Sequence, residues 1–210
     1  MRSGKHAQTR PAPVPVALML IDVLTTFQFP DGDAILQGAL GMRDALVKLK
    51  ARARKLGIPV LYVNNNFGDW RSEKEVLMGR CLEAKGAQFV RPLLPDSEDY
   101  FVLKPMHSAF YMTPLEVLLL HLQVETLILT GLTSNSCITV TAHDANMRGF
   151  DIYIPAGLLV RAQRGRAHAG AGAVGGDGRS EPHAFGFAET AESHSCSADL
   201  AANGCGALIN

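Results

Sequence analysis

The apolar run at residues 124–130, VETLILT, most constrains the fold, because β-branched residues and leucines ending at Gly131 are typical of a strand covered on both faces. Ile138, Ala142 and Ala145 then recur at near-helical spacing, which predicts a helix over residues 135–148. A buried strand followed at once by a helix indicates one unit of a parallel sheet. Similar patterns predict strands at residues 15–22, 59–64, 100–104 and 151–154, helices at 34–56, 71–85 and 114–122, and a polar linker with Pro92 and Pro95.

Cys137 lies at the turn between this strand and this helix, where Ser134, Asn135 or Ser136 can cap the helix start. A thiol at a helix N-terminus lies near free N–H groups and the positive end of the helix dipole, so we expect its thiolate to be favoured at neutral pH. Cys137 is therefore predicted to be a nucleophile. The alternative is a small buried cysteine that only fills space, since free cysteine is among the most buried residue types.

Two other predicted strands end on ionisable residues. Asp22 follows the apolar residues 16–21, and Lys104 follows residues 100–103 and precedes Pro105. The carboxyl ends of parallel strands meet at the edge of the sheet where open α/β folds bind ligands. Asp22 and Lys104 alone would also fit a structural ion pair. An acid, a lysine and a cysteine that each follow a strand favour a catalytic site instead.

These segments together resemble the isochorismatase-like cysteine hydrolases, a family that includes nicotinamidases and carbamoyl-amide hydrolases. The resemblance covers about residues 15–156 and rests on IDVLTTF around Asp22, KPMHSAFYMTPL from Lys104 and TGLTSNSCITVTAHDANMRGF around Cys137. It implies an α/β, Rossmann-like fold in three layers, with a mainly parallel sheet in the strand order 3-2-1-4-5-6. It identifies the superfamily and leaves the substrate open.

The resemblance also implies a mechanism of amide hydrolysis. Asp22 would be the general base that takes the thiol proton and later activates water, and Lys104 would support the thiolate and the acid electrostatically. Cys137 would attack a small amide or related C–N bond and form a thioester. The peptide bond between Thr133 and Ser134 would be cis, and the backbone N–H groups of Thr133 and Cys137 would form the oxyanion hole.

Departures from the family pattern bear on cofactor and substrate. Nicotinamidase-like members carry an Asp-x-His metal site after the second strand, whereas residues 64–70 read NNNFGDW here, without a histidine. We therefore expect no metal and no other cofactor, and nicotinamide is less favoured as the substrate. True isochorismatases lack the cysteine, so Cys137 argues for acyl transfer. The expected substrate-pocket residues are Phe27, Asn66, Phe67, Trp70 and His107.

For Phe27 and Trp70, ordinary core packing is an equal alternative to a place in the pocket, and for Phe110 core packing is preferred. His107 is expected at the rim of the pocket.

Composition fits one cytoplasmic enzyme domain of 210 residues, of which 47% are hydrophobic. Lys plus Arg and Asp plus Glu each number 20, so there is no electrostatic argument for nucleic acid or an acidic membrane surface as partner. The four cysteines show no CxxC pair or disulfide spacing, which favours a reducing compartment. The expected partners are a small-molecule substrate and, in a homo-oligomer, further copies of the chain.

Both ends of the chain differ from the domain between them. Residues 1–14 are expected to be a flexible lead-in, and residues 157–210 to be an atypical, disordered tail in which glycine and alanine dominate and lysine is absent. The last helix and strand of the fold would then be altered or missing. Read one base later, the codons of residues 157–174 are compatible with the acidic sequence that the family has there, so we hypothesise a frameshift near codon 157.

Two other functions remain open at this stage. A catalytically impaired or non-catalytic relative is the main alternative, because an altered C-terminus would leave one flank of the sheet exposed. A nucleotide-binding module is weaker, since residues 22–26 read DVLTT where a glycine-rich phosphate loop would follow the first strand.

Overall fold

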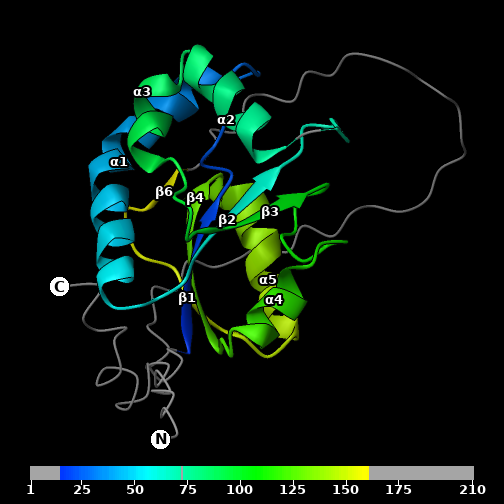
Figure 1. Cartoon of the computed structure of the whole chain (residues 1–210). Helices are drawn as coiled ribbons and strands as arrows, with labels where there is room; N and C mark the ends of the chain where they lie inside the picture. Colours follow the sequence, from blue (N-terminus) through cyan, green and yellow to red (C-terminus); the bar gives the residue numbers. More distant parts are fainter. Residues whose placement is uncertain (1–14, 72, 161–210) are drawn as a thin grey trace, which may run out of the picture.

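The computed structural model describes residues 15–71 and 73–160, whose six strands form one parallel sheet (Figure 1). Five strands lie in the order β3-β2-β1-β4-β5, which confirms the predicted α/β fold and this part of the strand order. Their bounds are β1 (Val16–Ile21), β2 (Val60–Asn65), β3 (Tyr100–Lys104), β4 (Thr126–Leu132) and β5 (Asp151–Tyr153).

Helices cover both faces of the sheet, and β1 shows why (Figure 1). Its side chains point alternately to the two faces. Leu18 and Leu20 belong to the same core cluster as the buried side chains of α1, whereas Met19 and Ile21 belong to the cluster that contains those of α4 and α5. The helices are α1 (Gly32–Lys55), α2 (Lys74–Glu83), α3 (Ala87–Val90), α4 (Leu115–His121) and α5 (Thr139–Met147).

The longest helix, α1, shows how local sequence and packing agree. Leu46, Leu49 and Ala53 are buried at spacings of three and four residues, so they share one face of the helix. The helix ends before Gly57, which has a φ of 70°. Glycine adopts this left-handed conformation at little cost and commonly follows the last turn of a helix. The prediction of a helix over residues 34–56 is therefore confirmed within two residues at its start.

The segment with Pro92 is not the polar linker that the sequence predicted. It contains α3 and the short 3-10 helix η1 (Arg91–Leu93). Phe89, Val90 and Leu93 are completely buried in the cluster on the α1 side of the sheet, so burial of these side chains stabilises the segment. Proline is tolerated in the first turn of a helix, where its missing N–H group would have no partner in any case.

A sixth strand, β6 (Leu159–Val160), lies within the segment predicted to depart from the fold. It pairs with β4 at Gly131 and Leu132, further along that strand than Thr126–Ile128, which pair with β5. Val160 is buried and lies close to Gly38 of α1, where an added Cβ would come within 2.9 Å of its side chain. The expected loss of sheet structure from residue 157 is thus wrong for residues 159 and 160, because this short apolar run packs under α1.

The predicted lead-in at residues 1–14 and the remainder of the predicted tail, residues 161–210, lie outside the described residues. Among the residues that are described, no helix is both long and apolar enough to cross a lipid bilayer.

Close contact between β1 and β4 positions the ends of both strands. Gly131 pairs with Ile21 and has a φ of 124°. A Cβ at this position would lie 2.0 Å from the backbone oxygen of Ile21, so only glycine fits. The strands therefore approach each other closely one residue before Asp22.

Replacing Gly131 with Ala is expected to lower the free energy of unfolding by about 2–4 kcal/mol, because backbone strain adds to overpacking against β1. Urea denaturation measures the change. Gly41→Ala is the matched control, because Gly41 is an exposed residue of α1 with open space around it. We expect Gly41→Ala to be neutral or stabilising by up to about 1 kcal/mol. Equal stability of the two variants would contradict the role of Gly131.

Candidate active site

The three ionisable residues predicted from the sequence meet at the carboxyl edge of the sheet. Asp22 directly follows β1, Lys104 is the last residue of β3, and Cys137 lies five residues after the end of β4. Lys104 Nζ is 2.9 Å from Asp22 Oδ2 and 3.3 Å from Cys137 Sγ. One ammonium group therefore links the carboxylate and the thiol.

Lys104 is completely buried, and its charge is compensated by contacts on all sides. Besides Asp22 and Cys137, Nζ donates a hydrogen bond to the backbone oxygen of Met106 at 3.1 Å. An ammonium group has three hydrogens, so these partners use its full donor capacity. The other oxygen of Asp22, Oδ1, accepts a hydrogen bond from the backbone N–H of Asn65 at 2.8 Å. The ion pair thus holds both side chains in one orientation.

The environment of Cys137 raises the pKa of its thiol to about 11. Burial is the largest cause and the negative charge of Asp22 is the next, whereas the positive charge of Lys104 acts in the opposite direction. The prediction of a favoured thiolate at neutral pH is therefore wrong for this resting site. With a pKa of about 11, Cys137 is mainly a thiol at neutral pH.

The turn that carries Cys137 also differs from the prediction. The cis peptide bond joins Leu132 to Thr133, one residue earlier than expected, because β4 extends to Leu132 and the turn begins there. Cys137 lies in a π-helical turn, Ser134–Ile138, which continues into α5. The N-cap residues of these two helices, Thr133 and Ile138, form no side-chain capping hydrogen bond.

His107 lies beside the thiol, nearer to the reacting atom than the pocket rim where the sequence placed it. Its Nδ1 is 3.6 Å from Cys137 Sγ and 3.1 Å from Ser136 Oγ. Sequence reasoning considered Ser136 only as a helix cap. Its position next to Cys137 was the one signal that could have identified it as part of the site.

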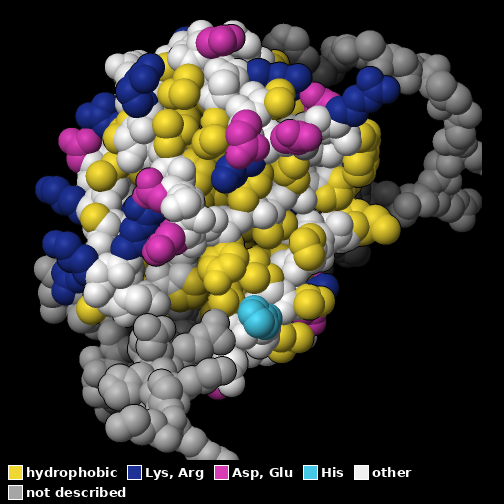
Figure 2. All heavy atoms as spheres, viewed as in Figure 1, with side chains coloured by type: hydrophobic (Ala, Val, Ile, Leu, Met, Phe, Trp, Pro, Cys, Tyr) yellow, Lys and Arg dark blue, Asp and Glu magenta, His cyan; other side chains and the backbone are white. Residues whose placement is uncertain are grey.

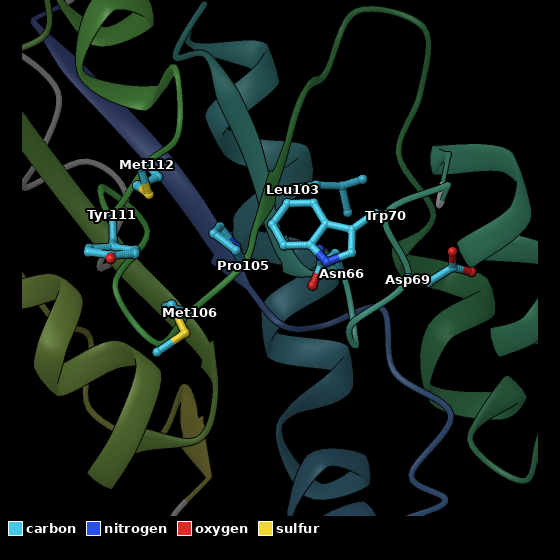
Figure 3. A pocket seen from close by; sticks show the side chains of 8 residues that line it. All are labelled: Asn66, Asp69, Trp70, Leu103, Pro105, Met106, Tyr111 and Met112. Carbon is cyan, nitrogen blue, oxygen red and sulfur yellow. The ribbon is translucent and has the colours of Figure 1, made fainter.

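A cavity of about 600 Å³ lies between the loop after β2 and the loop after β3 (Figure 3). Two of the predicted pocket residues, Asn66 and Trp70, line this cavity. The other wall of the cavity is formed by the loop after β3, in which His107 was the one residue predicted to lie in the substrate pocket. The other lining residues are Asp69, Leu103, Pro105, Met106, Tyr111 and Met112.

The other predicted pocket residues lie elsewhere. Phe27 is completely buried and packs edge-on against Phe89 in the core, so it does not line this cavity. Phe67 is exposed and His107 contacts the thiol, and neither lines the cavity. Phe110 is a core residue stacked on Phe150, as predicted.

Exposed apolar side chains surround the cavity. Trp70 and Met112 are each 82% exposed, and Met106 and Tyr111 are about half exposed. Figure 2 shows hydrophobic side chains gathered at the side of the molecule where β2 and β3 end. The mouth of this cavity is therefore apolar.

Metal ligands do not cluster in the described part of the chain. Within residues 15–71 and 73–160, no group of three or more His, Cys, Asp and Glu side chains is arranged to hold a metal ion. Asn64, in the region that carries a metal site in nicotinamidase-like proteins, is buried and donates a hydrogen bond to the backbone oxygen of Leu24 at 2.7 Å.

Replacing Asp22 with Asn is expected to speed alkylation of Cys137 by iodoacetamide at about pH 8. The substitution removes a charge that raises the pKa of the thiol and leaves Lys104, which lowers it, so more thiolate forms. The thiolate fraction should rise about tenfold for each unit by which the pKa falls, and the alkylation rate should rise by less than that, because a thiolate of lower pKa is a weaker nucleophile. Mass spectrometry of the alkylated peptides measures the rate for each cysteine.

Cys81 is the internal control of that experiment. It is fully buried in the core, and burial alone raises the pKa of its thiol to about 11. Its alkylation should not respond to the substitution at Asp22. An unchanged or slower rate at Cys137 would contradict the electrostatic coupling between the two residues.

Comparison with known proteins agrees with this fold. The Isochorismatase domain family matches residues 16–165, a range that includes β6. The chain is 34% identical over 139 residues to the uncharacterized isochorismatase family protein YaaI of Bacillus subtilis (strain 168), a match that covers 66% of this chain and 77% of that protein. It is 29% identical over 184 residues to ureidoacrylate amidohydrolase RutB of Methylorubrum extorquens, covering 70% of this chain and 74% of that one.

Among solved structures, a cysteine hydrolase from Pseudomonas syringae pv. phaseolicola 1448A has the same fold. The TM-score is 0.60 at 20% sequence identity, and the match covers 76% of this chain and 78% of the other. Because the family match extends over most of the described residues, this chain belongs to the isochorismatase family.

Proposed function

We propose that this protein is a cysteine hydrolase that cleaves a small amide or related C–N bond through a thioester on Cys137. The observation that carries the proposal is the position of the buried Lys104 ammonium, within 3.3 Å of both Asp22 and Cys137. A lysine that touches only an acid would fit a structural ion pair. A lysine that also touches a thiol, at the ligand-binding edge of the sheet, supports nucleophilic catalysis.

Asp22 is the base that starts the reaction. Its side chain forms a hydrogen bond with Cys137, so it can take the thiol proton directly. Lys104 then lies beside the new thiolate and stabilises its charge, which offsets the high pKa of the resting thiol. Catalysis here depends on moving a proton from Cys137 to Asp22 when the substrate binds, because the resting site holds no stable thiolate.

The thiolate attacks the amide carbonyl, and the carbonyl oxygen becomes an oxyanion. The backbone N–H groups of Thr133 and Cys137 are the proposed donors to this oxyanion. The C–N bond then breaks, and Asp22 returns its proton to the leaving amine. Water finally attacks the thioester, which releases the acid and restores the thiol.

The cavity beside Lys104 supports a small-molecule substrate with an apolar portion. Leu103 and Pro105, the chain neighbours of Lys104, line it together with Trp70 and Tyr111. Asp69 is the one charged residue in this lining, and its carboxylate is bound by Arg80 at 2.9 Å. The related ureidoacrylate amidohydrolase is named for cleaving a C–N bond, which agrees with the bond class proposed here.

Substitution of the proposed catalytic residues should abolish amide hydrolysis. A panel of small primary amides and ureido compounds, assayed by release of ammonia, identifies a substrate of the native protein. With that substrate, Cys137→Ala and Asp22→Asn are each expected to lower kcat/KM on the order of 1,000-fold or more. The control is Val140→Ala, which alters an exposed side chain of α5 close to Cys137 in sequence.

We expect Val140→Ala to keep native activity. Ammonia release that survives Cys137→Ala would contradict the thioester. A native protein that hydrolyses nothing in the panel would favour the alternative of a catalytically impaired relative.

A further inference from the structure

Cys137 Sγ contacts two chemically different neighbourhoods. On one side are Lys104, which is completely buried, and Asp22, whose side chain is 14% exposed. On the other is His107, an exposed residue whose Nδ1 lies 3.6 Å from the sulfur. The mechanism proposed above uses Asp22 and Lys104 and assigns no role to the imidazole of His107. A titratable ring next to the reacting atom and open to water is well placed to handle a proton that comes from water.

The loop that carries His107 is fixed to the helix that follows Cys137. Ser108 is buried, and its hydroxyl donates a hydrogen bond to Asp144 of α5. The backbone N–H of Ala109, which is also buried, donates to Thr141 Oγ1 of α5 at 3.0 Å. The residues after His107 and the residues after Cys137 therefore belong to one packed unit, which fixes the imidazole relative to the thiol.

Ser136 sets the orientation of the ring. Its Oγ lies 3.1 Å from Nδ1, so Nδ1 faces one hydroxyl and one thiol. Each of these groups can donate a hydrogen to a neutral imidazole nitrogen. When Cys137 becomes a thioester, the sulfur has no hydrogen left to donate. Of these two groups, only the Ser136 hydroxyl, which can rotate, then competes with water for the lone pair of Nδ1.

Asp22 is less exposed to water than His107, since only 14% of its side chain is exposed. Its Oδ2 is bound by Lys104 at 2.9 Å and its Oδ1 accepts a hydrogen bond from the N–H of Asn65 at 2.8 Å. The family resemblance assigns the hydrolytic water to Asp22, whereas the contacts in this site favour the exposed imidazole.

We propose that His107 is the general base of thioester hydrolysis, a role that rests on the acyl-enzyme of the proposed function. Water forms a bond to the thioester carbonyl carbon while one of its protons passes to Nδ1 of His107. The C–S bond then breaks with its electron pair on Sγ, and His107 returns the proton to the sulfur. The products are the free carboxylic acid and the Cys137 thiol, and His107 is neutral again. Asp22 is therefore the base in acylation, and His107 is the base in deacylation.

The test uses p-nitrophenyl acetate, an activated acyl donor that needs no knowledge of the natural substrate. Acylation of Cys137 releases p-nitrophenolate in a burst, and deacylation sets the slower steady rate. Cys137→Ala gives the background. In His107→Ala we expect a burst amplitude within about twofold of native and a steady rate about 100-fold lower. Intact-protein mass spectrometry should show that the acetyl-enzyme accumulates, and peptide mapping should locate it on Cys137.

His107→Asn separates proton transfer from simple positioning. The Asn amide can form a hydrogen bond near the place of Nδ1 but cannot accept a proton from water. We expect it to deacylate as slowly as His107→Ala, and added imidazole to restore part of the rate in His107→Ala. A native steady rate in His107→Asn would show that the side chain only positions the thiol and would overturn the proposal.

Two further outcomes separate this inference from the proposed function. A native burst combined with an unchanged steady rate in His107→Ala overturns the role of His107 and leaves the thioester mechanism standing. Equal slowing of burst and steady rate in His107→Ala overturns it as well, since the residue would then serve both half-reactions. Absence of a burst in the native protein overturns the thioester and the inference together.

Discussion

The ammonium group of Lys104 has no contact with solvent, so the folded chain must surround it with acceptors. Those acceptors come from distant parts of the sequence: Asp22 after β1, Cys137 after β4, and the backbone oxygen of Met106. They converge because the strands are parallel and their carboxyl ends share one edge of the sheet. Gly131 allows β1 and β4 to approach closely at that edge. The packing of the sheet therefore sets the positions of Asp22 and Cys137 around the buried charge of Lys104.

The same compensation bears on the protonation of Cys137. Asp22 balances Lys104, and its negative charge and the burial of the site together raise the pKa of the Cys137 thiol. A protonated thiol avoids an uncompensated buried negative charge, so the proposed reaction begins with a proton transfer. The proposed base for that transfer is Asp22, which the ion pair with Lys104 holds in place. The contacts that compensate the charge of Lys104 would therefore also serve the proposed catalysis.

The ionisable residues of the candidate site and the apolar cavity lie on different parts of the fold. The strand ends supply the ionisable groups, whereas the loops after β2 and β3 supply the apolar cavity and the exposed side chains around it. The loop after β3 takes part in both. Its first residues line the cavity beside Lys104, and Ser108 and Ala109 bind it to α5. His107 stands between these two regions, next to the thiol.

Most of the strands and helices, and the places of Asp22, Lys104 and Cys137 after strands, could be predicted from the polarity patterns of short segments. The helices on both faces of the sheet and the strand order followed from the family resemblance. Spacing could not show that Phe89 and Leu93 make the predicted linker a buried segment, or that Leu159–Val160 joins the sheet. Nor could it place Phe27 in the core, or His107 beside the thiol. The dipole argument from sequence predicted a thiolate at Cys137, and the structure reverses it through burial and the charge of Asp22. These features depend on tertiary packing, because packing sets which side chains are buried and which charges from distant segments come together.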